Sequence, residues 1–391
     1  MPSVPSVPAV NQRPEILMTP GPTPVPHFVL EAQAAPLVYH RGPGFAKLLN
    51  EVVDGVRWLL ETTSDVIVYS SSGTGGMEGA VANLVSQGDK VLVVSVGYFG
   101  ERFRTICERF GCEVTYLGYE WGQVAKAPDV AKALDADPEI SMVFVQHSET
   151  STGVVNDVES IARVVRERNR LMVLDAISSA GAIDIRMDDW GIDVCIGGSQ
   201  KALGASPGVA FVAVGPRAWE AHRKSTAPRF YWDWTAYKDA FERPEAESPW
   251  TPAISVIAGL AASMRQARAE GRAEILNRHA LLARAVKSGI QALGLDLMGE
   301  DPERAVVVTA VRTPEGLTDT QIVGSLRSKH GIVVAPGQGP LKGQVFRIGH
   351  LGWFEPLDII RFFAALELVL ADLGYTVKFG SAVAAAEEVL R

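Results

Sequence analysis

The sequence predicts an α/β fold: a large domain built on a mostly parallel, doubly wound sheet, and a smaller C-terminal α+β domain. Strand-like and helix-like segments alternate between residues 65 and 214, which is typical of parallel strands joined by crossover helices. Polar residues follow several of the apolar runs, where open α/β sheets bind their ligands. The alternation ends near residue 216, and a second set of helices and strands follows.

The chain has 391 residues, which is enough for two domains. We expect a disordered Pro- and Ser-rich tail at residues 1–17. An arm and the large domain are expected at 18–265, and the small domain at 266–391. Prolines favour an extended backbone in residues 18–24 (MTPGPTP), so the arm is expected to be rigid.

Short apolar runs predict the strands of the large domain, and apolar residues at helical spacing predict its helices. The predicted strands are residues 65–69, 90–96, 113–117, 142–146, 171–174, 194–196 and 209–214. The predicted helices are residues 27–36, 44–62, 77–85, 101–110, 128–137 and 158–168. Residues 216–250 are rich in Arg, Trp, Tyr and Asp and show neither pattern.

The same patterns continue to the end of the chain. Helices are predicted at residues 251–268, 275–293, 319–330 and 356–373, and strands at 305–312, 331–335 and 344–348.

Composition excludes several classes of function. The formal net charge is −8 and there is no basic run, which argues against nucleic acid as a partner. No apolar stretch is long enough to span a membrane, and the N-terminus lacks a signal pattern, so we expect a cytoplasmic protein. The three cysteines include no Cys-x-x-Cys pair and the seven histidines no His-Glu-x-x-His, so we expect no metal site.

Lys201 follows the predicted strand 194–196 among small and apolar neighbours. Burial disfavours an ammonium ion, lowers its pKa and frees the amine as a nucleophile, as a Schiff-base lysine requires. Asp175 follows another buried strand, where an unpaired charge is costly and needs a partner. An ordinary surface lysine and a structural ion pair at Asp175 are the alternatives.

Residues 70–76 (SSSGTGG) lie between a predicted strand and a predicted helix, an arrangement that holds phosphates. The segment lacks the Lys of a P-loop and the third Gly of a dinucleotide fingerprint, so a merely tight turn is the alternative. Phe99 lies between two glycines after the next strand and is suited to stack on a flat ring, or to pack in the core.

In chain order these features match the needs of pyridoxal phosphate: a phosphate anchor, a ring stack, a carboxylate for the ring nitrogen and an amine. The sequence resembles the class V, fold-type I aminotransferases, near the alanine–glyoxylate and serine–glyoxylate or pyruvate group. The similar segments are TPGPTPVP, SSGTGGMEGAV, GYFGERF, HSETSTGVVND, VLDAISSAGAIDIRMDDWGIDVCIGGSQKALGASPG and FRIGHLG.

The resemblance implies transamination between alanine or serine and glyoxylate or pyruvate, in a homodimer whose subunits share each site. Lys201 would carry pyridoxal phosphate as a Schiff base and move the proton, and Asp175 would pair with the ring nitrogen. The other implied cofactor contacts are Thr74, Gly75, Gly76, Phe99, Thr150, Ile177, Gln200 and, from the neighbouring subunit, Thr251. Arg347 would bind the substrate carboxylate, with Gly21 of the arm beside it.

The chain departs from the family at Ser248, where an aromatic hydroxyl is common, and at Gly76, which is often His in the glyoxylate enzymes. Arg41, Arg229 and Trp250 are candidates to shape the substrate pocket. An acidic donor such as aspartate, a lyase of the same fold and a non-catalytic cofactor-binding protein are the alternatives.

Two other enzyme classes fit poorly. Residues 204–208 (GASPG) match the nucleophile elbow of hydrolases, but an apolar run follows Ser206 in place of a helix. A cysteine desulfurase needs a cysteine in the last third of the chain, and none follows Cys195.

Overall fold

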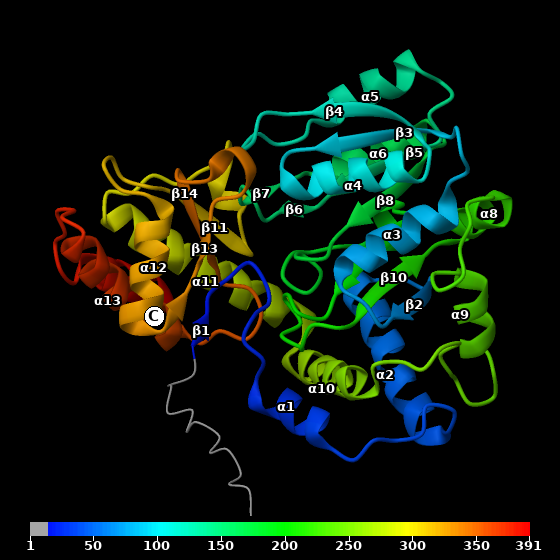
Figure 1. The fold of residues 1–391 in the computed structure, drawn as a ribbon, viewed down its shortest axis with the longest axis horizontal. Helices are drawn as coiled ribbons and strands as arrows, with labels where there is room; N and C mark the ends of the chain where they lie inside the picture. The colour runs from blue at the N-terminus through cyan, green and yellow to red at the C-terminus, as the bar shows by residue number, and fades with distance from the viewer. Residues whose placement is uncertain (1–14) are drawn as a thin grey trace, which may run out of the picture.

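The computed structural model describes residues 15–391, and its centre is a seven-stranded sheet (Figure 1). The strand order is β2-β10-β9-β8-β5-β3-β4. Every neighbouring pair is parallel except those made by β10, which runs antiparallel to β2 and to β9. The strands are β2 (Asp65–Tyr69), β3 (Lys90–Ser95), β4 (Glu113–Gly118), β5 (Met142–Gln146), β8 (Leu171–Asp175), β9 (Val194–Gly198) and β10 (Ala210–Val214).

Helices cover both faces of this sheet, because its strands are apolar on both sides and alternate residues point to opposite faces. One face packs against α2 (Pro43–Leu60), α5 (Ala127–Ala136), α6 (Val158–Glu167) and α10 (Ile254–Glu270). The other packs against α3 (Gly73–Leu84), α4 (Tyr98–Arg109), α8 (Pro216–Lys224) and α9 (Trp234–Phe241). The sheet thus has the doubly wound arrangement that the sequence predicts.

A smaller antiparallel sheet, in the order β11-β14-β13, lies beside the large one (Figure 1). Its strands are β11 (Val308–Arg312), β13 (Ala335–Pro336) and β14 (Val345–Gly349). A separate apolar core joins this sheet to the last helices of the chain. These are α11 (Arg272–Ala292), α12 (Asp319–His330), α13 (Pro356–Asp372) and α14 (Ser381–Leu390).

The N-terminal arm connects the two sheets. Strand β1 (Ile16–Leu17) pairs with β12 (Ile332–Val333), and Met18 is buried in the core of the small sheet. Five residues later, Thr23 Oγ1 donates to the Lys201 carbonyl at 2.9 Å. Helix α1 (His27–Ala34) then packs on α10. The expected disorder of residues 1–17 therefore does not extend to β1, while residues 1–14 lie outside the described part.

Several elements differ from the sequence-based predictions. Helix α3 begins at Gly73 and α4 at Tyr98, each earlier than predicted, so Gly75 and Gly76 are helical. The segment 216–250 contains two helices, α8 and α9, where no regular pattern was visible. Helix α14, the hairpin of β6 (Ser148–Glu149) with β7 (Val154–Val155), and the short α7 (Met187–Trp190) were not predicted.

In residues 15–391, no helix has both the length and the apolar character needed to cross a bilayer.

Candidate active site

A cavity lies at the carboxyl ends of the parallel strands, where an open α/β sheet binds its ligands. It brings together seven of the residues singled out from the sequence: Thr74, Phe99, Thr150, Asp175, Ile177, Gln200 and Lys201. Its remaining lining residues are Ser72, Gly73, Arg102, Ser148 and Ser178. These residues come from strand ends, from the N-terminal turns of α3 and α4, and from the β6–β7 hairpin.

Lys201 brings an amine into this cavity. Burial, with smaller contributions from the charges of Arg347 and Arg102, lowers its pKa to about 8, against an opposing effect of Asp175. Its Nζ donates to the Pro20 carbonyl of the arm at 2.7 Å. A Cβ on Gly21, which has a φ of +137°, would lie 2.5 Å from this Nζ. The position of Lys201 Nζ therefore requires glycine at position 21, because any side chain there would overlap with the amine.

Asp175 ends β8 and is almost fully buried. Burial raises the pKa of its carboxyl to about 7, although Oδ1 accepts from the Ile177 N–H at 2.9 Å. The neighbouring strand β5 ends at Gln146, which is in register with Asp175. The next residue, His147, is buried, and burial lowers the pKa of its ring to about 4. Because the pKa of Asp175 is near neutral, a cation bound beside it would favour the ionised carboxylate.

Phe99 lies in the first turn of α4, and a buried acid holds that turn in place. Glu149 Oε2 accepts from the N–H groups of Phe99 at 2.8 Å and Gly100 at 3.3 Å. Its Oε1 accepts from the N–H of Ser151 at 3.0 Å and from Ser151 Oγ at 2.6 Å. Glu149 is therefore a helix cap that fixes the aromatic ring, and sequence reasoning missed it because the two residues are fifty positions apart.

The N-terminus of α3 lines the cavity with Ser72, Gly73 and Thr74, whereas Gly75 and Gly76 are not among the lining residues. The N–H groups of Gly75 and Gly76 donate to the Ser72 carbonyl, at 2.9 and 3.4 Å. A Cβ on Gly75 would meet Trp232, and one on Gly76 would meet the Ile196 side chain in the sheet. The absence of a side chain at these two positions allows α3 to pack closely, and their contact with phosphate stays a prediction.

Gln200 and Ile177 line the same wall of the cavity. The Gln200 amide oxygen is buried, and among the described residues it has no hydrogen-bond partner. Ile177 packs against Gly73, where a Cβ would lie 2.6 Å from the isoleucine Cδ1. Glycine at position 73 is therefore required for the two walls to approach each other.

Arg347, on β14, reaches the cavity wall without lining the cavity itself. Nη1 donates to the Thr150 carbonyl at 3.0 Å and to Gln338 Oε1 at 3.1 Å. Nε and Nη2 donate to the Pro336 carbonyl, at 3.0 and 2.8 Å. Burial lowers the pKa of this arginine to about 10. The guanidinium is positioned by two loops, and Gln338 occupies one of its donors.

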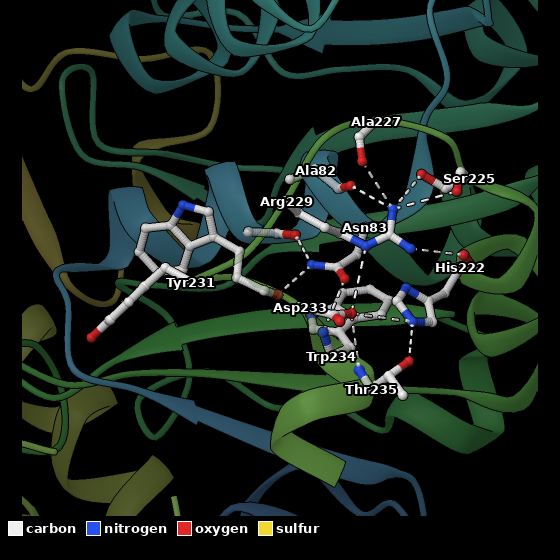
Figure 2. A network of polar contacts seen from close by, with 12 residues as sticks. Ala82, Asn83, His222, Ser225, Ala227, Arg229, Tyr231, Asp233, Trp234 and Thr235 are labelled. Carbon is white, nitrogen blue, oxygen red and sulfur yellow. Dashed lines mark hydrogen bonds and ion pairs between the residues drawn. The ribbon is translucent and has the colours of Figure 1, made fainter. Parts of the chain in front are cut away.

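Thr251 lies outside the cavity of its own chain and is exposed. Arg229, a candidate to shape the substrate pocket, also lies elsewhere: Figure 2 shows its guanidinium surrounded by backbone carbonyls. Its Nη atoms donate to the carbonyls of Ala82, His222, Ser225 and Ala227. It supports the segment that packs behind α3, and the prediction for Arg229 was wrong because the sequence does not show which way the loop turns.

Asn83 completes that support from α3. Its Nδ2 donates to the Trp232 carbonyl at 2.6 Å and its Oδ1 accepts from the Trp234 N–H at 3.0 Å (Figure 2). Tyr69 Oη donates to the same Trp232 carbonyl at 2.8 Å. The last turn of α3 is therefore held by a polar network with the segment that follows α8.

Arg102 and Ser148 are among the lining residues that were not anticipated. Arg102, one turn after Phe99, points at α3, where its Nη1 donates to Thr74 Oγ1 at 2.8 Å. Ser148 is buried, and its hydroxyl has no hydrogen-bond partner in the part of the chain that the structure describes. The spacing of Arg102 from Phe99 on one helix was a signal that could have revealed it.

Another cavity is larger, about 410 Å³ against about 100 Å³. It lies at the opposite ends of the strands, where β2 begins, among residues such as Asp65 and Arg217. It contains none of the predicted site residues. Among residues 15–391 no group of three or more His, Cys, Asp and Glu side chains is arranged to hold a metal ion.

The donor set of the smaller cavity fits pyridoxal phosphate. It combines a lysine of lowered pKa, a buried carboxyl, an aromatic ring and a helix N-terminus. The unpartnered Ser148 hydroxyl and Gln200 amide oxygen are buried polar atoms that a bound polar ligand would satisfy.

Comparisons with known proteins agree over nearly the whole chain. Residues 21–344 match the family model for class-V aminotransferases. The chain is 40% identical over 381 residues to a soluble hydrogenase small subunit from Synechococcus sp. (strain PCC 6716), covering 96% of this chain and 98% of the relative. It is 37% identical over 381 residues to the L-aspartate–glyoxylate aminotransferase of Paracoccus denitrificans (strain Pd 1222), covering 96% of each. The solved structure of ureidoglycine–glyoxylate aminotransferase (pucG) from Bacillus subtilis superposes with a TM-score of 0.93 at 29% identity, covering 98% of this chain and 99% of that one.

Proposed function

The chain belongs to the class-V aminotransferases, and from that premise we propose that it transfers the amino group of alanine or serine to glyoxylate or pyruvate with pyridoxal 5′-phosphate. One observation carries the proposal: Lys201, Asp175 and Phe99 line a single cavity together with the N-terminus of α3. The names of the Paracoccus and Bacillus proteins both include glyoxylate, which supports it as the acceptor. They differ in the amino donor, and aspartate is the alternative donor for this chain.

Pyridoxal phosphate, when bound, supplies an aldehyde that joins an amine and a ring that withdraws electrons from the α-carbon of the amino acid. Lys201 is the amine of the protein. With a pKa of about 8, an appreciable fraction of Nζ is unprotonated near neutral pH, and the Pro20 carbonyl orients it. Lys201 would hold the cofactor aldehyde, and its free Nζ would be the base that accepts the substrate α-proton and donates it again.

Asp175 keeps the ring nitrogen protonated. In the protein alone, burial holds its carboxyl pKa at about 7. A protonated nitrogen beside it is an opposite charge in a buried site, and it would lower this pKa so that the carboxylate form prevails. Phe99, fixed by Glu149, supplies the flat surface on which the ring stacks.

Arg347 is proposed to bind the substrate α-carboxylate. Its guanidinium is held by the Pro336 and Thr150 carbonyls, so the carboxylate would meet a donor already oriented. The Gln338 amide oxygen accepts one of the Nη1 hydrogens, and this bond would break when a carboxylate binds the guanidinium through two hydrogen bonds.

We also propose a homodimer in which Thr251 completes the site of the partner. Thr251 is exposed and does not line the cavity of its own chain. Large apolar side chains are exposed around the first helices and near Thr251: Leu30, Leu37, Tyr39 and Phe230. Such a surface supports contact with a second copy of the chain.

The test is a spectroscopic and product assay. Purified protein supplied with pyridoxal phosphate should develop a visible absorbance band, and an amino donor should bleach it. Alanine, serine and aspartate are then paired in turn with glyoxylate, pyruvate and 2-oxoglutarate, and amino acid products are measured. No product from any pair, or wild-type turnover by Lys201→Ala, would overturn the proposal.

A further inference from the structure

Arg102 is held inside the cavity in an orientation that directs its charge at the N-terminus of α3. Its Nη1 donates to Thr74 Oγ1 at 2.8 Å. Its guanidinium carbon lies 4.7 Å from the centre of the Phe99 ring and 5.4 Å from that of Tyr98. The two rings and the threonine therefore fix the side chain in place.

The phosphate contacts suggested by the sequence carry no positive charge: Thr74, Gly75, Gly76, Gln200 and Thr251 are all neutral. A phosphate monoester has a charge of about −1.5 to −2 near neutral pH. Burying such a charge is costly unless a cation pairs with it. Two cationic side chains line the cavity, and one of them, Lys201, is needed at the aldehyde.

The backbone donors narrow the position of the anion. Because Gly75 and Gly76 donate to Ser72, the Gly73 and Thr74 N–H groups are those that open on the cavity, and neither has a backbone acceptor among the described residues. Arg102 is bonded to the side chain of Thr74, so its guanidinium and these N–H groups converge on one place. The Ser148 hydroxyl, buried and unpartnered in the described residues, independently indicates that this cavity receives a polar ligand.

We propose that Arg102 is the cation of this chain that binds the cofactor 5′-phosphate, together with the backbone of Gly73 and Thr74. The inference rests on the proposed function. It adds a cation to the expected phosphate contacts and assigns Arg102, which neither sequence nor resemblance had singled out. The rival assignment is that Arg102 binds the second carboxylate of an acidic donor such as aspartate.

Pyridoxal and its 5′-phosphate separate the two assignments, because they differ only in the phosphate. Each is titrated into apoprotein and followed by its visible band. Arg102→Gln should weaken the affinity for pyridoxal phosphate by about tenfold to hundredfold, which corresponds to the loss of a charge-assisted hydrogen bond. It should leave the affinity for pyridoxal within about twofold of wild type. Arg102→Lys keeps the charge without the planar fork of the guanidinium, so it should lose less affinity for pyridoxal phosphate than Arg102→Gln.

The matched control is Arg104→Gln, which removes the same charge from the same helix on its exposed side, where Arg104 pairs with Glu108. It should leave both affinities unchanged. Inorganic phosphate should compete with pyridoxal phosphate in wild type, and measurably more weakly in Arg102→Lys, which also covers the case in which the glutamine variant does not fold.

Two outcomes overturn the inference. Equal loss of pyridoxal and pyridoxal phosphate means that Arg102 shapes the site without binding phosphate. Unchanged affinity for both, with a raised Michaelis constant for aspartate alone, assigns Arg102 to the substrate. If wild type binds neither compound, it is the proposed function that fails.

Discussion

Burial acts on the two principal side chains of the site in opposite directions. It lowers the pKa of Lys201 to about 8 and raises that of Asp175 to about 7, so near neutral pH both groups lie close to the change of charge state. Neither shift requires an unusual partner, because desolvation of the charged form is the largest cause of each. The cavity therefore increases the neutral fraction of the Lys201 amine before any ligand has entered.

The first prediction concerns the pH dependence of Lys201 in the apoprotein. Because its pKa is lowered, the reactive amine is present above about pH 8 and disappears as the pH falls below it. Acylation of Lys201 by an amine reagent, followed by peptide mass spectrometry, should level off just above that pH. Lys90, whose pKa Glu139 and Asp137 raise, should still be accelerating and is the internal control.

Asp175→Asn extends this measurement. Asp175 raises the Lys201 pKa, so its removal should move the midpoint of the acylation curve to lower pH. A midpoint that moves upward, or a wild-type curve that coincides with that of Lys90, would contradict the electrostatic account of the site.

The second prediction concerns Gln338, which shares Arg347 Nη1 with the Thr150 carbonyl. Gln338→Ala frees one guanidinium hydrogen and should lower the Michaelis constants of carboxylate substrates by about tenfold or more, since a hydrogen bond to a charged group contributes about 1.5–3 kcal/mol. Gln338→Glu places a carboxylate on the same donor and should raise them by more than about tenfold. Calorimetry of a carboxylate ligand with apoprotein should show the same opposite signs, and shifts in one direction for both variants would exclude this competition.

Single residues were predictable where the chain itself positions them. Lys201 and Asp175 directly follow buried strands, so their place at one edge of a parallel sheet follows from the sequence pattern. Glu149 binds N–H groups about fifty positions away, and Gln338 binds a side chain of a different element, strand β14. The start of α3 at Gly73 was not predicted, because helix starts are hard to locate from sequence, and it decides which N–H groups of the Gly-rich turn remain unbonded.

At the scale of elements, the site depends on where two helices begin. Helix α3 presents its first N–H groups to the cavity, and the network of Arg229 and Asn83 supports it from behind (Figure 2). Helix α4 presents Phe99 and Arg102 from successive turns, and Glu149 caps it. Asp319, at the start of α12, similarly binds the N–H groups of Gly337 and Gly343 around the loop that carries Gln338.

The third prediction tests the cap of α4. Glu149→Gln keeps the shape of the side chain but replaces one acceptor oxygen by an N–H₂ group that faces donors. Loss of charge-assisted bonds at a buried helix terminus should reduce the free energy of unfolding by about 2–3 kcal/mol. Chemical denaturation measures this change, and weaker binding of both pyridoxal and pyridoxal phosphate should accompany it because Phe99 loses its position.

Glu108→Gln on the exposed part of α4 is the control and should change stability by less than about 0.5 kcal/mol. Equal effects of the two substitutions would mean that Glu149 contributes no more than a surface acid.

The segment 216–250 shows why some elements escaped prediction: α8 and α9 are short, and their large aromatic residues pack on α3 rather than forming a regular apolar stripe.

At the scale of the whole molecule, the site lies where the large sheet, the small sheet and the arm meet. The arm pairs with β12, accepts from Gly349 N–H through the Met18 carbonyl, and then contacts Lys201 through Pro20 and Thr23. Arg347 joins the small sheet to the β6–β7 hairpin through Thr150. The doubly wound sheet was predictable from periodicity, whereas these junctions depend on contacts between distant segments that periodicity does not encode.

The last prediction follows from the exposed position of Thr251 and asks whether two chains share each site. Lys201→Ala and Thr251→Asp subunits should each be inactive alone, the second because a carboxylate would repel the phosphate. In a mixed dimer, however, the site holding an intact Lys201 receives an intact Thr251 from its partner. Unfolding and refolding an equal mixture should therefore restore about a quarter of wild-type activity, since random pairing makes about half the dimers mixed and each has one complete site. Refolding each variant alone is the control, and a mixture no more active than the separate variants would show that Thr251 serves its own chain or no site at all.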